Sequence, residues 1–219
     1  MVTNEMRLPL LKRSAVILAG GFSKRFGQDK GLVQLLGKPL ILHVLDTISG
    51  VVDETVVVVS SKCQIDPIEG LLQGKANIVV DKGRTQSPLI GASTGFENVK
   101  GKYSLLLPCD TPFVSSHIAS LLLDLCINKS GVIPRWPNGY IEPLQAVYHT
   151  KSALTATKTA LKEKKLDLRS MIAHLKSIRY VSTLVLEQID SELLTFFNIN
   201  TLEDLRKAEY KFKIDTKMS

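Results

Sequence analysis

Residues 15–32 read AVILAGGFSKRFGQDKGL, an apolar run that passes directly into two glycines and then into a basic segment. The run from Ser14 to Leu18 has the length and the β-branched content of a buried strand. The Gly20-Gly21 pair offers backbone N–H groups that can approach phosphate oxygens with no side chain in the way. Arg25 and Lys30 add positive charge for a polyanion. The stretch therefore predicts a strand followed by a phosphate-binding loop.

The loop differs from the two common nucleotide-binding motifs. Gly20, Gly21 and Gly27 do not have the G-x-G-x-x-G spacing, and the chain contains no G-x-x-x-x-G-K-[ST] segment. A Rossmann dinucleotide site and a kinase-type P-loop are therefore disfavoured.

Short β-branched runs alternate with segments of helical period along the rest of the chain, which is typical of an α/β layered fold. The strands expected after the first are residues 54–60, 76–80, 103–107, 131–134, 144–148, 179–186 and 196–199. The helices expected from apolar spacing and capping residues are 39–49, 116–128 and 201–211.

Composition describes an ordinary globular protein: 219 residues, of which 44% are hydrophobic and 22% are charged. No linker rich in Gly, Ser or Pro divides the chain. We expect one domain over residues 1–219, with a nucleotide-binding part at about 13–112 and an acceptor-substrate part at about 113–204.

The net charge of +7 admits a nucleic acid, an acidic membrane surface or a phosphorylated small molecule as partner. The densest basic cluster, Lys158 to Lys165, lies on a predicted helix, where a solvated face is the default. Cys63, Cys109 and Cys126 match neither a disulfide framework nor a metal knuckle, and no apolar run reaches the roughly 20 residues of a membrane span. We expect a cytoplasmic protein that binds neither nucleic acid nor membrane.

The pattern L-A-G-G-x-S-x-R-x-G-x-D-K, from Leu18 to Lys30, resembles the signature of nucleotidyltransferases that activate phosphorylated metabolites. Within that group the chain most resembles the molybdenum cofactor guanylyltransferases. Further blocks follow in the family's order at 37–40 (GKPL), 88–91 (PLIG), 109–112 (CDTP) and 197–204 (FNINTLED). The resemblance implies a Rossmann-like three-layer α/β/α sandwich with a mixed, mostly parallel central sheet.

The resemblance also implies the reaction: transfer of GMP from GTP to the terminal phosphate of molybdopterin, or of its molybdenum-loaded form, with Mg²⁺ as cofactor and pyrophosphate as leaving group. Transient contact with molybdenum-cofactor enzymes or their chaperones would follow. Three alternatives stay open. The base could be cytosine, the acceptor could be a sugar phosphate or cobinamide phosphate, or the chain could bind nucleotide without turning it over.

Asp110 follows a predicted strand and stands between Pro108 and Pro112, at the edge where open α/β sheets bind ligands. From the residues alone it is either a helix-capping aspartate or a Mg²⁺ ligand, and the resemblance favours the ligand. The resemblance also implies that Lys30, Arg25 and Asp110 carry catalysis. The residues that it implies for substrate binding are Leu18, Ala19, Gly20, Gly21, Lys30, Ser61, Asp81, Asp110, Asn198 and Asn200.

Asp81 resembles the family's nucleotide-binding aspartate, although a turn aspartate is the plainer interpretation. Asn198 and Asn200 are expected on one face of the last strand, near the pterin or the metal. Two departures from the family leave the base open: the chain has Ser60-Ser61-Lys62 where an asparagine is frequent, and Ser87 where a glycine is frequent. Glu142 and Trp136 are weaker candidates, since a loop tryptophan either stacks on a heterocycle or packs into local core.

Overall fold

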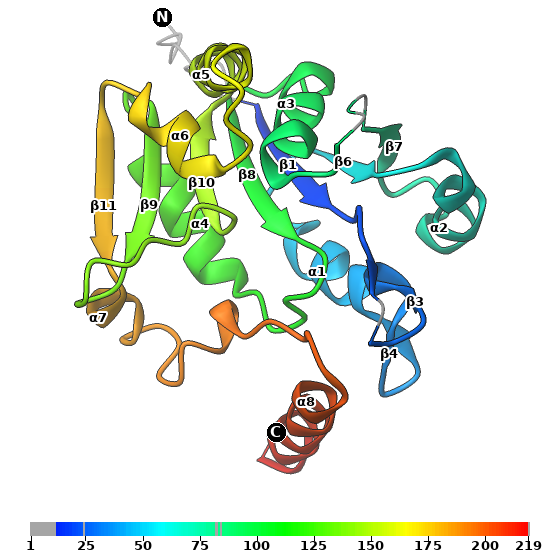
Figure 1. Cartoon of the computed structure of the whole chain (residues 1–219). Helices are drawn as coiled ribbons and strands as arrows, with labels where there is room; N and C mark the ends of the chain where they lie inside the picture. The colour runs from blue at the N-terminus through cyan, green and yellow to red at the C-terminus, as the bar shows by residue number, and fades with distance from the viewer. Residues whose placement is uncertain (1–11, 24, 82, 84, 219) are drawn as a thin grey trace, which may run out of the picture.

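A seven-stranded sheet, drawn in Figure 1, forms the centre of the computed structural model, which describes residues 12–23, 25–81, 83 and 85–218. The strand order is β11-β9-β10-β8-β1-β6-β7. The strands are β1 (Arg13–Leu18), β6 (Glu54–Val59), β7 (Asn77–Val80), β8 (Tyr103–Pro108), β9 (Gly131–Arg135), β10 (Ala146–His149) and β11 (Ile178–Ser182). Neighbouring strands run parallel, except that β10 runs antiparallel to both β8 and β9. The sheet is therefore mixed and mostly parallel, as predicted; residues 1–11 of the expected domain lie outside the described residues.

Helices cover both faces of this sheet (Figure 1). The helices are α1 (Leu40–Ile48), α2 (Ile65–Leu72), α3 (Pro88–Asn98), α4 (Ser116–Leu125), α5 (Thr150–Lys162), α6 (Leu168–Ala173), α7 (Thr183–Leu186) and α8 (Leu202–Met218). Alternate residues of β1 serve the two layers: Ala15 and Ile17 pack with α1, α2 and α4, whereas Val16 packs with α3, α5 and α6. No helix in the described part of the chain is long and apolar enough to cross a membrane.

Two short β-hairpins link β1 to α1, and residues of the second hairpin region pack against α8. β2 (Phe22–Ser23) pairs with β3 (Gln28–Asp29), and β4 (Gln34–Leu35) pairs with β5 (Lys38–Pro39). Leu36 and Gly37 both have positive φ at the tip of the second hairpin, which explains the glycine of the GKPL block. Leu35 and Leu40 of this region form a third apolar cluster with Ala208 of α8, and α8 lies below the sheet in Figure 1.

The expected strand at 196–199 is wrong. Residues 194–196 form a 3₁₀ turn, and the segment after it pairs with no described strand of the sheet. Ile199 instead donates its backbone N–H to the carbonyl of Asp110 at 2.9 Å, so the segment lies against the β8–α4 loop. The expected strand at 179–186 is right only as far as Ser182, because the Ser182 hydroxyl accepts from the Leu184 N–H and starts α7.

Other boundaries follow from capping. Ser115 caps α4, and Ser87 caps α3 by accepting from the Ile90 N–H, with Pro88 at the first helical position. Ser87, which replaces the family's frequent glycine, is therefore the N-cap of this helix. The Asp204 carboxylate accepts from the backbone N–H and hydroxyl of Thr201, which confirms the predicted start of the last helix.

Gly95 sets how closely α3 approaches the sheet. A Cβ at this position would lie 2.2 Å from Cγ1 of Val16, which is fully buried in β1. We expect Gly95→Ala to lower the free energy of unfolding by about 1–3 kcal/mol, the usual cost of overpacking a core. Urea unfolding of both proteins measures the difference.

Gly70 of α2 provides the control, because no atom lies within 4 Å of a Cβ built there. Gly70→Ala should leave stability unchanged or raise it slightly, since alanine favours a helix. Equal effects of the two substitutions would contradict close packing at Gly95.

Candidate active site

The loop after β1 packs on the end of the neighbouring strand β6. A Cβ at Gly20 would lie 3.1 Å from both Cβ and backbone N of Ser60, so only glycine fits without displacing the strand end. Gly21 has φ +143° and Gly27 has φ +66°, backbone conformations that favour glycine. The glycines therefore bring the loop backbone against the carboxyl edge of the sheet.

Lys30 joins three segments that are far apart in the sequence. Its Nζ donates to Asp110 Oδ2 at 2.8 Å and to Asn200 Oδ1 at 2.6 Å. Lys30 ends the glycine loop, Asp110 follows β8, and Asn200 precedes α8. Because β1 and β8 are parallel neighbours and the next strand in sequence, β6, lies on the other side of β1, these groups meet where the strand order reverses, the usual ligand site of such sheets.

Asp110 has one carboxylate oxygen engaged and one free of any partner. The side chain belongs to a residue only 7% exposed, and Oδ1 is buried without a hydrogen bond. A buried acceptor of this kind calls for a ligand, since leaving it unsatisfied costs free energy. Among the described residues, no group of three or more His, Cys, Asp or Glu side chains gathers around a possible metal site. Asp110 thus fits a cation that takes a single carboxylate and completes its shell with water and phosphate oxygens, as Mg²⁺ does.

A pocket of about 280 Å³ opens between the glycine loop and the ends of β6, β7 and β8. Lys30 and Asp110 lie at one part of its wall. The other lining residues are Leu18, Gly20, Val58, Val59, Ser60, Asp81, Gln86, Ser87, Pro88, Gly91, Pro108, Cys109 and Leu144. The mixed polar and apolar wall suits a ligand that has both charged groups and a flat apolar ring.

Asp81 stands at the end of β7 and faces this pocket. Its Oδ1 accepts from the Gly83 N–H at 2.9 Å, and its Oδ2 lies 3.9 Å from the position a Cβ of Gly91 would take. Burial raises the pKa of the Asp81 carboxyl, and the Gly83 hydrogen bond opposes that rise in part. Both oxygens accept hydrogen bonds when the group is ionised, so the site favours a ligand that donates.

A second pocket of about 370 Å³ adjoins the first, since Pro88, Pro108 and Leu144 line both. Its polar wall includes Glu142, Arg169 and Asn198. The remaining lining residues are Tyr140, Pro143, Gln145, Leu166, Asp167 and Leu168. Two adjoining pockets can hold two substrates side by side.

Trp136 contacts Glu142, a wall residue of the second pocket. Its Nε1–H donates to Glu142 Oε1 at 2.7 Å, and its ring packs edge-on against Phe196 with centroids 5.7 Å apart. Burial raises the pKa of Glu142, opposed by the tryptophan hydrogen bond. Trp136 is therefore packed into local core and is not among the described residues that line the pocket.

Most of the residues expected at the site lie together. Leu18, Gly20, Lys30, Asp81 and Asp110 line the first pocket, Asn198 lines the second, and Asn200 contacts Lys30. The described linings contain neither Ala19, Gly21, Arg25 nor Ser61. Arg25 is exposed, and the Ser61 hydroxyl contacts Cys63 Sγ at 2.9 Å.

Sequence reasoning placed the Ser60-Ser61-Lys62 segment at the nucleotide but chose Ser61 rather than Ser60 as the binding residue, and it did not name Gln86 or Arg169 as wall residues. For Ser60 a signal existed, because it is the first residue after β6 and the carboxyl ends of parallel strands meet at the ligand edge. Arg169 gave no local signal, because α6 reaches the site through the fold alone.

Residues 15–178 match the family model of the MobA-like NTP transferase domain. The match covers most of the chain and includes the glycine loop, Asp81 and Asp110. The chain belongs to the MobA-like NTP transferase family.

Relatives of the MobA-like chain include two proteins named probable molybdenum cofactor guanylyltransferase. The one from Methanosarcina acetivorans is 33% identical over 199 residues, covering 88% of each chain. The one from Natranaerobius thermophilus is 34% identical over 198 residues, covering 89% of this chain and 94% of its own.

Solved structures of nucleotidyltransferases share the fold of this chain. Molybdopterin-guanine dinucleotide biosynthesis protein A from Archaeoglobus fulgidus is 27% identical with a TM-score of 0.77, covering 93% of this chain and 99% of its own. The 4-diphosphocytidyl-2C-methyl-D-erythritol synthase from Anaerococcus prevotii is 16% identical with a TM-score of 0.71, covering 92% and 96%, and shows the shared fold alone. The predicted nucleotidyltransferase fold is confirmed.

Proposed function

We propose that this protein is a molybdenum cofactor guanylyltransferase, which transfers GMP from GTP to the terminal phosphate of molybdopterin and releases pyrophosphate. The names of its relatives support this function. The observation that carries the proposal is the junction of Lys30, Asp110 and Asn200 at the wall of the first pocket, beside a second pocket for an acceptor.

Lys30 acts on the reacting phosphates. The acceptor is a phosphate monoester whose second pKa is about 6, so it is already ionised near neutral pH and needs no general base. An oxygen of this monoester attacks the α-phosphorus of GTP. Asp110 and Asn200 hold the Lys30 ammonium at the edge of the pocket, where its charge stabilises the transition state, and the backbone of Gly20 and Gly21 offers N–H groups to the phosphates.

Asp110 would hold Mg²⁺ through its unpartnered Oδ1. A bound Mg²⁺ would neutralise charge on the phosphates of the nucleotide and orient them. The same carboxylate holds the Lys30 ammonium through Oδ2, so Asp110 would position both the metal ion and the lysine.

The second pocket binds the acceptor. Arg169 provides positive charge in its wall and lies over the ring of Tyr140 at 5.3 Å, while Glu142 and Asn198 provide polar partners for a heterocycle. We expect Arg169→Ala to raise KM for molybdopterin by about tenfold or more, the usual loss for a charge-assisted hydrogen bond, while KM for GTP stays unchanged. Steady-state kinetics with each substrate varied in turn measures both constants.

Lys162 at the end of α5 is a control, because it is exposed and belongs to neither described pocket lining. Lys162→Ala should leave both constants at the wild-type values. A rise in KM for GTP rather than for molybdopterin in Arg169→Ala would assign the second pocket to the nucleotide.

A thermal-shift panel of the four nucleoside triphosphates with Mg²⁺ tests the nucleotide assignment. A ligand at 100 times its Kd stabilises the folded state by about 2.7 kcal/mol, and at a fixed concentration the ligand that binds most tightly stabilises it most. At equal concentrations, GTP should therefore give the largest shift in Tm. A larger shift with CTP would favour a cytidylyltransferase. Binding of GTP without pyrophosphate release in the presence of molybdopterin would favour a homologue that has lost activity.

A further inference from the structure

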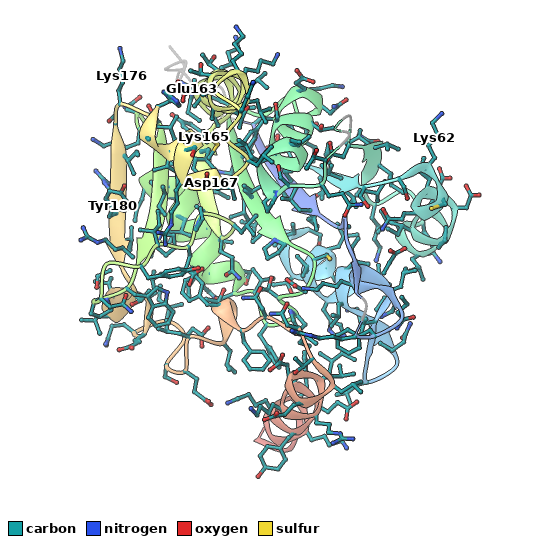
Figure 2. All side chains as sticks on the ribbon, viewed as in Figure 1. Lys62, Glu163, Lys165, Asp167, Lys176 and Tyr180 are labelled. Carbon is teal, nitrogen blue, oxygen red and sulfur yellow. The ribbon has the colours of Figure 1, made fainter. Side chains whose placement is uncertain are left out.

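Ser60 lies where the nucleotide pocket meets the end of β6. It lines the pocket, whereas the neighbouring Ser61 does not, and Lys62 of the same loop points away from the protein body (Figure 2). The Asp81 N–H donates to the carbonyl of Val59 at 2.7 Å, so Ser60 and Asp81 stand at the ends of adjacent strands. Both residues therefore contribute to one wall.

Gln64 fixes the role of the Ser60 hydroxyl. Its Oε1 accepts the backbone N–H of Ser60 at 2.8 Å and that of Ser61 at 3.1 Å. These two groups can only donate, so the atom that faces them must be the amide oxygen. The Ser60 hydroxyl donates its single proton to the same oxygen at 2.8 Å. Toward any further partner, Ser60 Oγ is then an acceptor.

The arrangement resists reversal. Gln64 is only 3% exposed, and its Nε2 is buried without a hydrogen-bond partner. A flipped amide would place this NH₂ group against two backbone N–H donors. The observed orientation therefore satisfies more hydrogen-bonding groups than the flipped one.

Asp81 presents the second acceptor in the wall. Its Oδ1 already receives the Gly83 N–H, which leaves Oδ2 on the side of Gly91 and Leu18. Two acceptors on adjacent strand ends call for a ligand edge that carries adjacent donors. Guanine has such an edge in its N1–H and its 2-amino group, whereas cytosine and adenine place acceptors beside their amino groups.

We propose that Ser60 Oγ, oriented by Gln64, accepts a hydrogen bond from the 2-amino group of guanine, and so makes Ser60 a specificity-determining residue. The inference rests on the proposed function, since it takes GTP as the nucleotide. Asp81 then accepts from N1–H. A base that brings an acceptor toward Ser60 finds no donor there, because the proton of the hydroxyl is held by Gln64.

Binding of GTP and ITP to Ser60→Ala tests the proposal, because hypoxanthine lacks only the 2-amino group of guanine. The wild-type protein should prefer GTP, and Ser60→Ala should reduce the ratio of the two affinities by about fivefold, the loss of one neutral hydrogen bond. The affinity for ITP should stay at the wild-type value. Gln64 keeps both backbone partners in this variant, so the loop should retain its fold.

Ser61→Ala is the matched control, since the Ser61 hydroxyl contacts Cys63 Sγ and lies outside the described pocket lining. It should leave the GTP to ITP ratio unchanged.

An unchanged ratio in Ser60→Ala, or an equal loss of affinity for GTP and ITP, would overturn the role of Ser60 while leaving the guanylyltransferase assignment intact. A loss for GTP and ITP that is absent with 2′-deoxy-GTP would place Ser60 on the ribose and likewise overturn it. If the wild-type protein binds GTP no better than the other triphosphates, the proposed function fails with it.

Discussion

Replacing Lys30 by alanine is expected to lower kcat/KM for GMP transfer by about 10²-fold or more, comparable to the loss of one oxyanion-hole donor in other enzymes. The ammonium group links Asp110 and Asn200 at 2.8 and 2.6 Å, so its loss removes positive charge from the phosphates and also separates the two side chains. Pyrophosphate release at saturating and limiting GTP measures the effect on kcat and on KM.

Lys38→Ala is the control, because Lys38 pairs with Asp46 and lies outside the described linings of both pockets. It should turn over at the wild-type rate. Wild-type turnover in Lys30→Ala would remove Lys30 from the site, and with it the argument that the junction of three segments performs the chemistry.

Asp110→Asn should also lower kcat by about 10²-fold or more, and should raise the Mg²⁺ concentration needed for half-maximal activity. Asparagine keeps the size of the side chain but removes the negative charge that faces Lys30, and it replaces one of the two carboxylate oxygens by an NH₂ group. A titration of activity with Mg²⁺ separates weaker metal binding from a slower chemical step.

Asp46→Asn is the matched control, since Asp46 pairs with Lys38 and Lys75 at the surface. Its Mg²⁺ titration should coincide with that of the wild type. An Asp110→Asn enzyme with the wild-type rate and the wild-type Mg²⁺ requirement would exclude Asp110 as a metal ligand and leave it a structural partner of Lys30.

Local sequence signals predicted the central sheet well, because β-branched runs such as Glu54–Val59 are buried on both faces and can take few other conformations. The same signals failed at residues 196–199. Asn198 and Asn200 flank a buried isoleucine and so imitate an alternating strand, but Ile199 packs with α8 and bonds to the Asp110 carbonyl. A segment forms a strand only where an unpaired strand edge lies beside it in the fold, and the local sequence pattern does not show whether such an edge is present.

The candidate site was predictable wherever a functional residue follows a strand directly. Asp81 follows β7 directly and Asp110 comes two residues after the end of β8, and the parallel order of the strands brings both to one edge, whereas Lys30 reaches this edge through the glycine loop. Ser60 and Ser61 show the limit of this reasoning. Adjacent residues at a strand end face different directions, and only the folded structure shows that Ser60, and not Ser61, lines the pocket.

The most direct test of the account is transfer of the α-phosphate label of GTP to molybdopterin by the purified protein with Mg²⁺. We predict one labelled product, the guanine dinucleotide form of the pterin, and one pyrophosphate for each label transferred. Absence of a labelled pterin with GTP and with every other triphosphate, from a folded protein, would contradict the assignment of this site to nucleotidyl transfer.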